Sequence, residues 1–147
     1  MSRFIKKRIG ELLLDQGILT QEQLDKALAT QKQTGRRLGE VLLDLNFVAE
    51  HDIVMVVSIQ YGCPYLPLDR YRIEAGMKGL LSEEAARKYQ VVPVDRIGSI
   101  LTVAMADPLD HEAVAAAKEE SGLEIQAFVA SRTEVLNAIA RLYRREG

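Results

Sequence analysis

An internal repeat places the strongest constraint on how this chain can fold. When the sequence is shifted by 29 positions, Arg8–Asp15 aligns with Arg37–Asp44, and six of the eight aligned pairs are identical. The similarity continues, so that residues 8–31 and 37–60 share seven identities over 24 positions. An arbitrary shift would give roughly one or two, and the repeat therefore predicts a structural duplication in which both copies fold alike.

Each copy is typical of a short helix, a tight turn and a longer helix. In the first copy, isoleucine and leucine within residues 9–13 recur at the spacing of one helix face. Gly17 follows, and glycine readily takes the left-handed conformation that ends a helix. Thr20 and Gln23 match a capping box, which predicts that the longer helix begins there.

The second copy departs from the first at its turn. Asn46 stands where the first copy has Gly17, and asparagine is the next-best residue for a left-handed position. Ala49 replaces the capping threonine. Residues 53–57 have the composition of a strand, but their place in the repeat predicts a helix.

The rest of the chain changes in character. We expect a helix beginning at Ser82, strands at 91–94 and 99–105 joined by 95–98, a helix after Asp107-Pro108, a strand at 123–130 and a last helix after Ser131. The sequence therefore predicts an α+β fold. Its parts are a helical region of two repeated helix-turn-helix motifs (1–61), a proline-containing connector (62–73) and a small α/β region with about three strands (74–147).

Composition excludes several classes of protein. No apolar run approaches the ~18 residues that a membrane span requires, and the first residues lack a signal-peptide core, so we expect a cytoplasmic protein without direct membrane insertion. The net charge of −2 argues against a nucleic-acid partner. Residues 1–40 nevertheless carry a charge of +3, which favours this region for any anionic ligand.

The usual enzyme signatures are absent from the sequence. It contains no phosphate-binding loop, no dinucleotide fingerprint and no zinc-hydrolase motif. His51 and His111 have no recognisable catalytic partner and are expected to face solvent. The single cysteine, Cys63, rules out a disulfide within the chain and is expected to be a small buried residue. We therefore predict a non-enzymatic protein with no metal or cofactor.

A glutamine ends the apolar stripe of each longer helix. Two explanations remain open: the amides meet backbone or solvent at the helix end, or they face a ligand, and their duplication favours the ligand. The stripes, at the spacing i, i+3, i+4, i+7, are Leu24, Ala27, Leu28, Gln31 and Ile53, Val56, Val57, Gln60.

The start of each shorter helix has a second duplicated feature. Arg8 and Arg37 precede the helices, and Gly10 and Gly39 lie in their first turns. A glycine inside a helix costs roughly 0.5–1 kcal/mol relative to alanine, which indicates close approach by another helix or by a ligand. An arginine beside free N–H groups at a helix start suits an anion, although a solvated arginine is the alternative. Together these features favour a pseudo-symmetric receptor for a two-fold ligand that is anionic in the middle and flat at each end.

These motifs resemble a known family. The pattern Arg-Ile-Gly-x-x-Leu-Leu-x-x-Gly-Ile-Leu-x-x-x-x-Leu-x-x-x-Leu-x-x-Gln at 8–31, with its second copy at 37–60, is similar to the tandem motif of the MshEN domain. That domain is the cyclic-di-GMP-binding N-terminal domain of type II secretion and type IV pilus assembly ATPases. The likeness extends to 62–73 and to 101–108.

The resemblance implies that each motif binds one guanine-bearing half of cyclic di-GMP. The arginines would contact guanine or phosphate, the glycines would admit the ligand and the stripes would form an apolar floor. The guanine N1–H edge needs acceptors, which glutamine and aspartate can supply. Asp107 is either such an acceptor or a helix N-cap. The implied ligand-binding residues are Arg8, Ile9, Gly10, Leu24, Leu28, Gln31, Arg37, Leu38, Gly39, Ile53, Val57, Gln60 and Asp107.

The resemblance leaves two functions open. The first is a regulatory domain that binds cyclic di-GMP and passes its occupancy to a secretion or pilus assembly ATPase, in cis or in trans. The alternative is a docking module of the same family that no longer binds nucleotide and tethers the ATPase to a partner such as an inner-membrane platform protein. Asn46 and Ala49 favour the alternative, and the two Arg/Gly/Gln sets favour binding.

Overall fold

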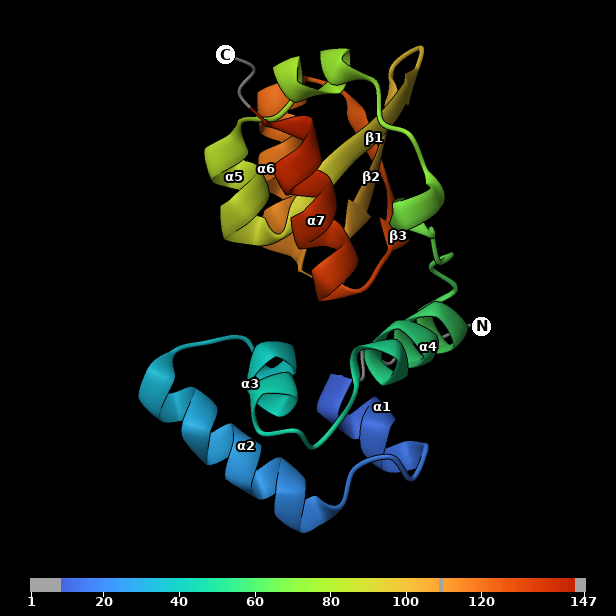
Figure 1. Cartoon of the computed structure of the whole chain (residues 1–147). Coiled ribbons are helices and arrows are strands. Elements are labelled where there is room, and N and C mark those ends of the chain that lie inside the picture. Colours follow the sequence, from blue (N-terminus) through green and yellow to red (C-terminus); the bar gives the residue numbers. More distant parts are fainter. Residues whose placement is uncertain (1–8, 109, 145–147) are drawn as a thin grey trace, which may run out of the picture. The chain divides into compact units, whose positions relative to one another are not determined.

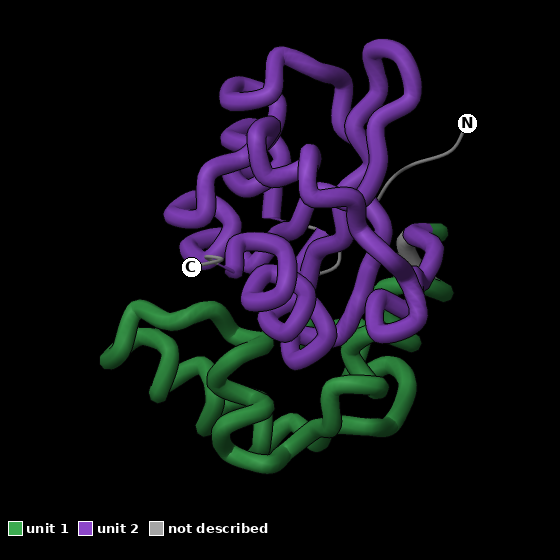
Figure 2. The backbone as a smooth tube through the Cα atoms, turned by 45° about the horizontal axis from the view of Figure 1, so that its top comes forward, with its two compact units in different colours: residues 1–62 green, residues 63–147 purple. Residues whose placement is uncertain are grey.

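The computed structural model describes residues 9–108 and 110–144 and divides the chain into two compact units. The first unit comprises residues 1–62 and the second residues 63–147 (Figures 1 and 2). The fold is α+β, with a helical first unit and a three-stranded sheet in the second. Most of the segment expected as a connector, from Cys63 onward, belongs to the second unit.

The first unit consists of the repeated helices in an exchanged arrangement. They are α1 (Ile9–Asp15), α2 (Gln21–Thr34), α3 (Leu38–Asp44) and α4 (Glu50–Tyr61). Helix α1 packs mainly on α4, and α3 packs mainly on α2, so the short helix of each copy lies against the long helix of the other. Leu13 and Leu42, which are equivalent in the repeat, are fully buried in this unit.

The capping box and the left-handed turn residues predicted for the first unit are confirmed. The Thr20 hydroxyl accepts from the backbone N–H of Gln23 at 3.1 Å, and the Gln23 side chain accepts from the N–H of Thr20 at 3.0 Å. Gly17 and Asn46 both have positive φ, at 74° and 59°. Residues 53–57 are helical, as the repeat predicts and as their composition does not.

Half of the capping box survives in the second copy. The N–H of Ala49 donates to Oδ2 of Asp52 at 2.9 Å, although alanine offers no acceptor in return. The loss is therefore confined to one hydrogen bond, and α4 still begins at the expected place.

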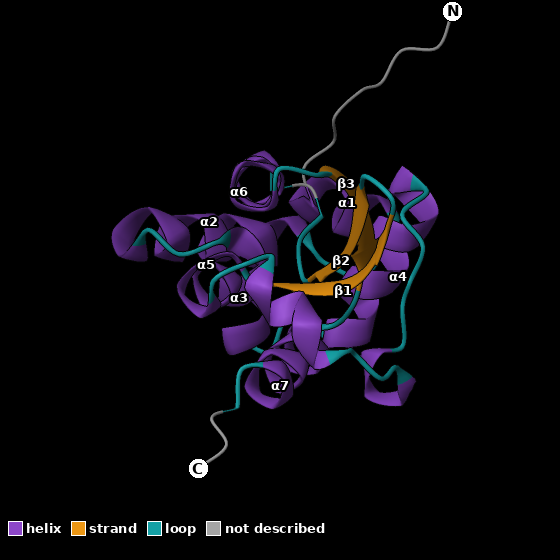
Figure 3. Ribbon diagram, turned by 90° about the horizontal axis from the view of Figure 1, so that it is seen from above, coloured by secondary structure: helices purple, strands orange, loops and turns teal. Residues whose placement is uncertain are grey.

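The second unit is a small sheet covered by helices. The sheet has the order β1-β2-β3, with β1 antiparallel to β2 and β2 parallel to β3 through the crossover helix α6. Figure 3 shows α5, α6 and α7 along one face of the curved sheet. The elements are the 3-10 turns η1 (Leu68–Arg70) and η2 (Ala75–Gly79), the helices α5 (Glu83–Tyr89), α6 (His111–Ser121) and α7 (Arg132–Leu142), and the strands β1 (Val91–Ile97), β2 (Ile100–Met105) and β3 (Glu124–Val129).

Two expectations in the second unit were wrong in detail. Strand β1 continues to Ile97, and the hairpin turns at Gly98, whose φ is 60°, so the loop is shorter than 95–98. The N-cap of α6 is Asp110 and not Asp107. The Asp110 carboxylate accepts from the backbone N–H groups of Glu112 and Ala113, both at 3.1 Å.

The start of the second unit pairs with the edge of the sheet. The N–H of Leu66 donates to the carbonyl of Val129 at 3.0 Å, and the N–H of Val129 donates to the carbonyl of Pro64 at 2.9 Å. The hydroxyl of Tyr65 donates to Glu134 of α7 at 2.8 Å. These bonds anchor residues 64–66 to β3 and to the start of α7.

Candidate ligand site

The two motif glycines occupy equivalent places but differ in the space around them. A Cβ atom at Gly10 would lie 2.7 Å from Cδ1 of Leu24 and 3.2 Å from Cδ2 of Leu38. At Gly39, the nearest atom to such a Cβ would be Cδ1 of Ile53, at 3.9 Å. The packing of neighbouring helices therefore accounts for glycine at position 10, whereas at position 39 an added methyl group would meet the described residues only in ordinary van der Waals contact.

The apolar stripes also differ in exposure. In the first copy Leu24 is buried, while Leu28 is 40% exposed and Gln31 is half-buried. In the second copy Ile53 is buried and Val57 has no exposed surface. The first stripe thus reaches the surface at Leu28, and the second is covered at the equivalent position.

The arginines before α3 have separate environments. Arg37 occupies the N-cap position with extended backbone, and its side chain is half-buried. The neighbouring Arg36 donates to Glu40 at 2.9 Å and also to Asp44. These hydrogen bonds raise the pKa of the exposed Arg36 guanidinium. The sequence did not predict this pairing, because Arg36 precedes the N-cap of α3 and the rule for residues four apart on one helix does not extend to it.

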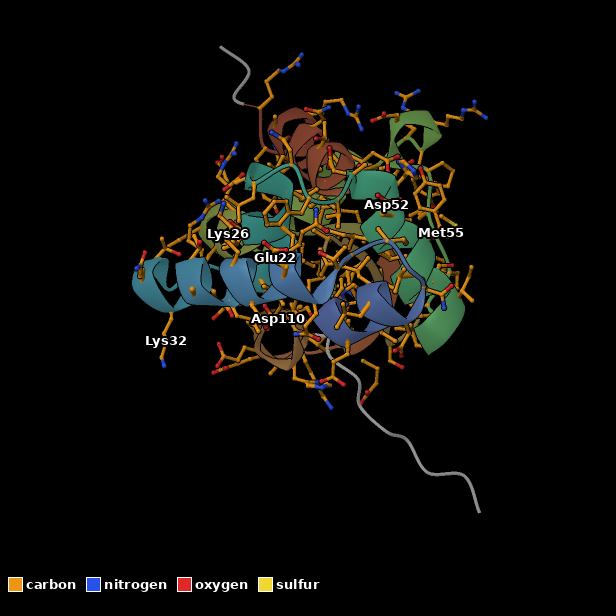
Figure 4. The ribbon with its side chains drawn as sticks, turned by 90° about the horizontal axis from the view of Figure 1, so that it is seen from below. Glu22, Lys26, Lys32, Asp52, Met55 and Asp110 are labelled. Atoms are coloured by element: carbon orange, nitrogen blue, oxygen red, sulfur yellow. The ribbon has the colours of Figure 1, made fainter. Side chains whose placement is uncertain are left out.

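The described part of the chain contains most of the expected site residues but not all of them. Arg8 lies outside it, and for Gln60 only the helical backbone is described. The carbonyl of Gln31 accepts from the N–H of Gly35 at 2.7 Å, so its backbone closes the end of α2. Helix α2 also carries Lys26 and Lys32, and the side chain of Lys32 extends away from the helix (Figure 4).

Asp107 lies in the second unit, in the loop between β2 and α6. It is half-buried, and its carbonyl accepts from the N–H of Asp110 at 3.1 Å. Since Asp110 caps α6, the carboxylate of Asp107 is not used as the N-cap. The structure brings Gly10, Leu24 and Leu38 together in the first unit; Asp107 belongs to the other unit.

The other polar candidates give no catalytic arrangement within the described residues. Cys63 is half-buried, where burial raises the pKa of its thiol, and its Sγ lies 3.4 Å from the carbonyl oxygen of Ala127. The imidazole of His51 is exposed and lies 3.3 Å from a carboxylate oxygen of Asp52. Across residues 9–108 and 110–144 no three potential metal ligands gather, and no helix is long and apolar enough to cross a membrane.

Comparisons with known proteins connect this architecture to one family. The model of the MshEN domain matches residues 61–147. The type IV pilus assembly ATPase PilB of Myxococcus xanthus (strain DK1622) is 36% identical over 140 residues, which are 95% of this chain and 25% of that protein. The chain therefore spans about a quarter of the length of this relative.

Two solved structures resemble the fold. The structure of MshE with cyclic di-GMP has a TM-score of 0.76 and 32% sequence identity, and the match covers 94% of this chain and all of that one. The N-terminal domain of XpsE has a TM-score of 0.80 and 26% identity, covering 97% and 99% of the two chains. Because these matches cover at least 94% of the chain, they include the two motif copies at 8–31 and 37–60, which lie before the residues that the family model matches.

Proposed function

We propose, since the chain belongs to the MshEN domain family, that its first unit binds cyclic di-GMP and that binding regulates a type II secretion or type IV pilus assembly ATPase, in cis or in trans. The observation that carries the proposal is the likeness to MshE with cyclic di-GMP, which extends over 94% of the chain. The bound chain acts as a non-enzymatic regulatory domain.

The geometry of the first unit supports a ligand on the motif face. Among the residues that the structure describes, Gly39 has no packing neighbour that requires glycine, and a backbone without a side chain there lets a planar base approach α3. Leu28 supplies exposed apolar surface of the kind that a purine covers. Burying that surface on binding would favour the complex.

The polar groups of the motifs supply the specificity in this proposal. Guanine presents O6 and N7 as a pair of acceptors, which a guanidinium matches with two parallel N–H donors. Arg8 and Arg37 have this role, or the related one of holding the phosphates. The side-chain oxygens of Gln31 and Gln60 accept from the N1–H and N2–H groups, and the carboxylate of Asp107 is a further acceptor in this proposal.

A docking module without nucleotide is the second candidate, and two observations favour it. Gly10 is explained by helix packing alone. Met55 and Ile59, one turn apart on α4, are 46% and 70% exposed, and the first copy has Lys26 and Thr30 at the equivalent positions. Figure 4 labels Met55 on α4 and Lys26 on α2. An apolar pair on one copy only suits a protein contact better than a two-fold ligand.

Isothermal titration calorimetry with cyclic di-GMP, and with GTP as control, separates the two candidates. We expect heat with cyclic di-GMP at micromolar concentration and none with GTP. Arg8→Ala and Arg37→Ala should each remove a charge-assisted contact of about 1.5–3 kcal/mol, which weakens binding about 10- to 150-fold. Circular dichroism of each variant checks that the fold is unchanged.

The outcomes of this titration distinguish nucleotide binding from docking without nucleotide. Absence of heat with the wild-type chain would leave the docking candidate, for which Met55→Lys should then weaken capture of the ATPase. If Arg8→Ala abolished binding while Arg37→Ala had no effect, the second motif would not share the ligand. Comparable losses support a receptor that uses both copies.

A further inference from the structure

The link between α2 and α3 joins the end of the first motif to the start of the second (Figure 1). Gln31 lies in the last turn of α2, and Arg37 is the N-cap of α3, so a short corner separates two of the proposed ligand contacts. Gly35 begins this corner with a φ of 71°, and its N–H donates to the carbonyl of Gln31. The backbone of residues 35–37 therefore decides where Arg37 lies relative to Gln31.

Arg36 ties this corner to both helices. Its backbone N–H donates to the hydroxyl of Thr34, the last residue of α2, at 3.3 Å. Its guanidinium donates to Glu40 at 2.9 Å and also to Asp44. Because these two carboxylates are four residues apart on α3, they lie on the same side of that helix. One residue thus connects the end of α2 with both ends of α3.

The same three types of charge recur in the first copy of the repeat. The residues at the positions equivalent to Arg36, Glu40 and Asp44 are Lys7, Glu11 and Asp15. The carboxylates are identical in the two copies, and the cation is lysine in one and arginine in the other. An aspartate at the last residue of a helix opposes the helix dipole, so its presence in both copies favours a role in pairing with the cation.

We propose that Arg36 is a positioning residue for the ligand site: its hydrogen bonds to Glu40 and Asp44 hold residues 35–37 in the conformation that places Arg37 beside the ligand. This role rests on the proposed function, because it requires a ligand that Arg37 contacts. A corner that is already ordered before binding loses less conformational freedom when the ligand arrives, and affinity rises for that reason.

The effect of Asp44→Asn on cyclic di-GMP affinity tests this role by its sign. The change removes a negative charge near the C-terminus of α3, so the helix dipole and the attraction of an anionic ligand both predict equal or tighter binding. Loss of the hydrogen bond to Arg36 predicts weaker binding instead. We expect the dissociation constant measured by calorimetry to rise about threefold, the scale of an exposed charge network.

The matched control for this variant is Asp25→Asn on α2. The Asp25 carboxylate accepts from the side chain of Gln21 at 2.8 Å, so the control removes the same charge from the same unit without touching Arg36. It should not weaken cyclic di-GMP binding. Equal weakening by Asp25→Asn and Asp44→Asn would show a general effect of charge and would overturn the role of Arg36.

A double-mutant cycle assigns the effect to the bond between the two side chains. In the Arg36→Gln chain this bond is already lost, so adding Asp44→Asn should leave the affinity equal or improve it. The same substitution therefore has opposite signs in the two backgrounds. Equal weakening in both would show that Asp44 acts without Arg36, which contradicts the proposal.

Amide hydrogen exchange followed by NMR tests the corner without ligand. The N–H of Val41 donates to the carbonyl of Arg37 at 3.1 Å and reports on the start of α3, whereas the N–H of Leu45 donates to the carbonyl of Val41 at 2.9 Å and reports on its end. Arg36→Gln should speed exchange about threefold at Val41 and leave Leu45 unchanged. Equal acceleration at both amides would indicate a general loss of stability and would overturn the positioning role.

The titrations also separate this inference from the proposed function. No heat from the unchanged chain would overturn the proposed function and, with it, the role of Arg36 toward the ligand. Heat from the unchanged chain, together with tighter binding by Asp44→Asn, would overturn the role of Arg36 alone.

Discussion

The repeated glycines provide a matched pair of substitutions that tests the packing of the first unit. Gly10→Ala places a methyl group 2.7 Å from one Leu24 methyl and 3.2 Å from a Leu38 methyl, distances at which neighbours must move. Overpacking of this kind costs about 1–3 kcal/mol. Gly39→Ala places its methyl 3.9 Å from Ile53 and requires no movement of the residues that the structure describes.

The backbone contribution of replacing glycine by alanine is the same in the two variants. Both glycines lie at the second residue of a seven-residue helix, so the gain of about 0.5–1 kcal/mol from replacing glycine by alanine is the same at both. The free energy of unfolding of Gly10→Ala should therefore be about 1–3 kcal/mol below that of Gly39→Ala, and Gly39→Ala should equal or exceed the unchanged chain.

Urea unfolding followed by far-ultraviolet circular dichroism measures this difference. Leu24→Val is a rescue substitution, because it removes bulk opposite Gly10. Combined with Gly10→Ala, it should cost less than the sum of the two single changes. Equal stability of Gly10→Ala and Gly39→Ala would refute the argument from close packing. Under the proposed function, Gly39→Ala should in addition weaken cyclic di-GMP binding, since its methyl group occupies space left for the ligand.

Three further changes have defined outcomes. Asn46→Gly relieves a non-glycine residue at a φ of 59° and should raise the free energy of unfolding by a few tenths to about 1 kcal/mol in urea titration, with cyclic di-GMP affinity equal or modestly better. Thr20→Ala removes the side-chain acceptor of the capping box and should lower the free energy of unfolding by about 1 kcal/mol, as followed by circular dichroism. Burial, and to a lesser extent the charges of nearby glutamates, raises the pKa of Tyr143 from 10.0 to about 12. Because the unfolded chain therefore loses the phenol proton at lower pH than the folded chain, the free energy of unfolding should fall between pH 10 and pH 12. Tyr143→Phe should reduce that fall.

The repeat was the most informative part of the sequence for the fold. Residues 53–57 favour a strand by composition, and only their alignment with 24–28 predicts the helix that the structure contains. Local propensity is a weak signal when the neighbouring helices bury the apolar side chains. The left-handed Asn46 was predicted for the same reason.

Features that depend on distant contacts were missed. Asp107-Pro108 matches the pattern of a helix start, but the chain makes an extra turn and α6 begins after Asp110. Residues 64–66 pair with β3, and three residues carry no periodicity that could predict a strand contact. The sequence also suggested that the two glycines are equivalent. In the structure, however, Leu24 fills the space beside Gly10, whereas Ile53 leaves room beside Gly39.

The exchange of partners in the first unit makes its two copies depend on each other. Because α1 packs mainly on α4 and α3 mainly on α2, one copy by itself would leave its short helix without most of its neighbours. Two separate single-copy chains could restore the same contacts only by associating as a symmetric pair. The two copies therefore depend on each other for packing, as the two chains of a symmetric exchanged pair would.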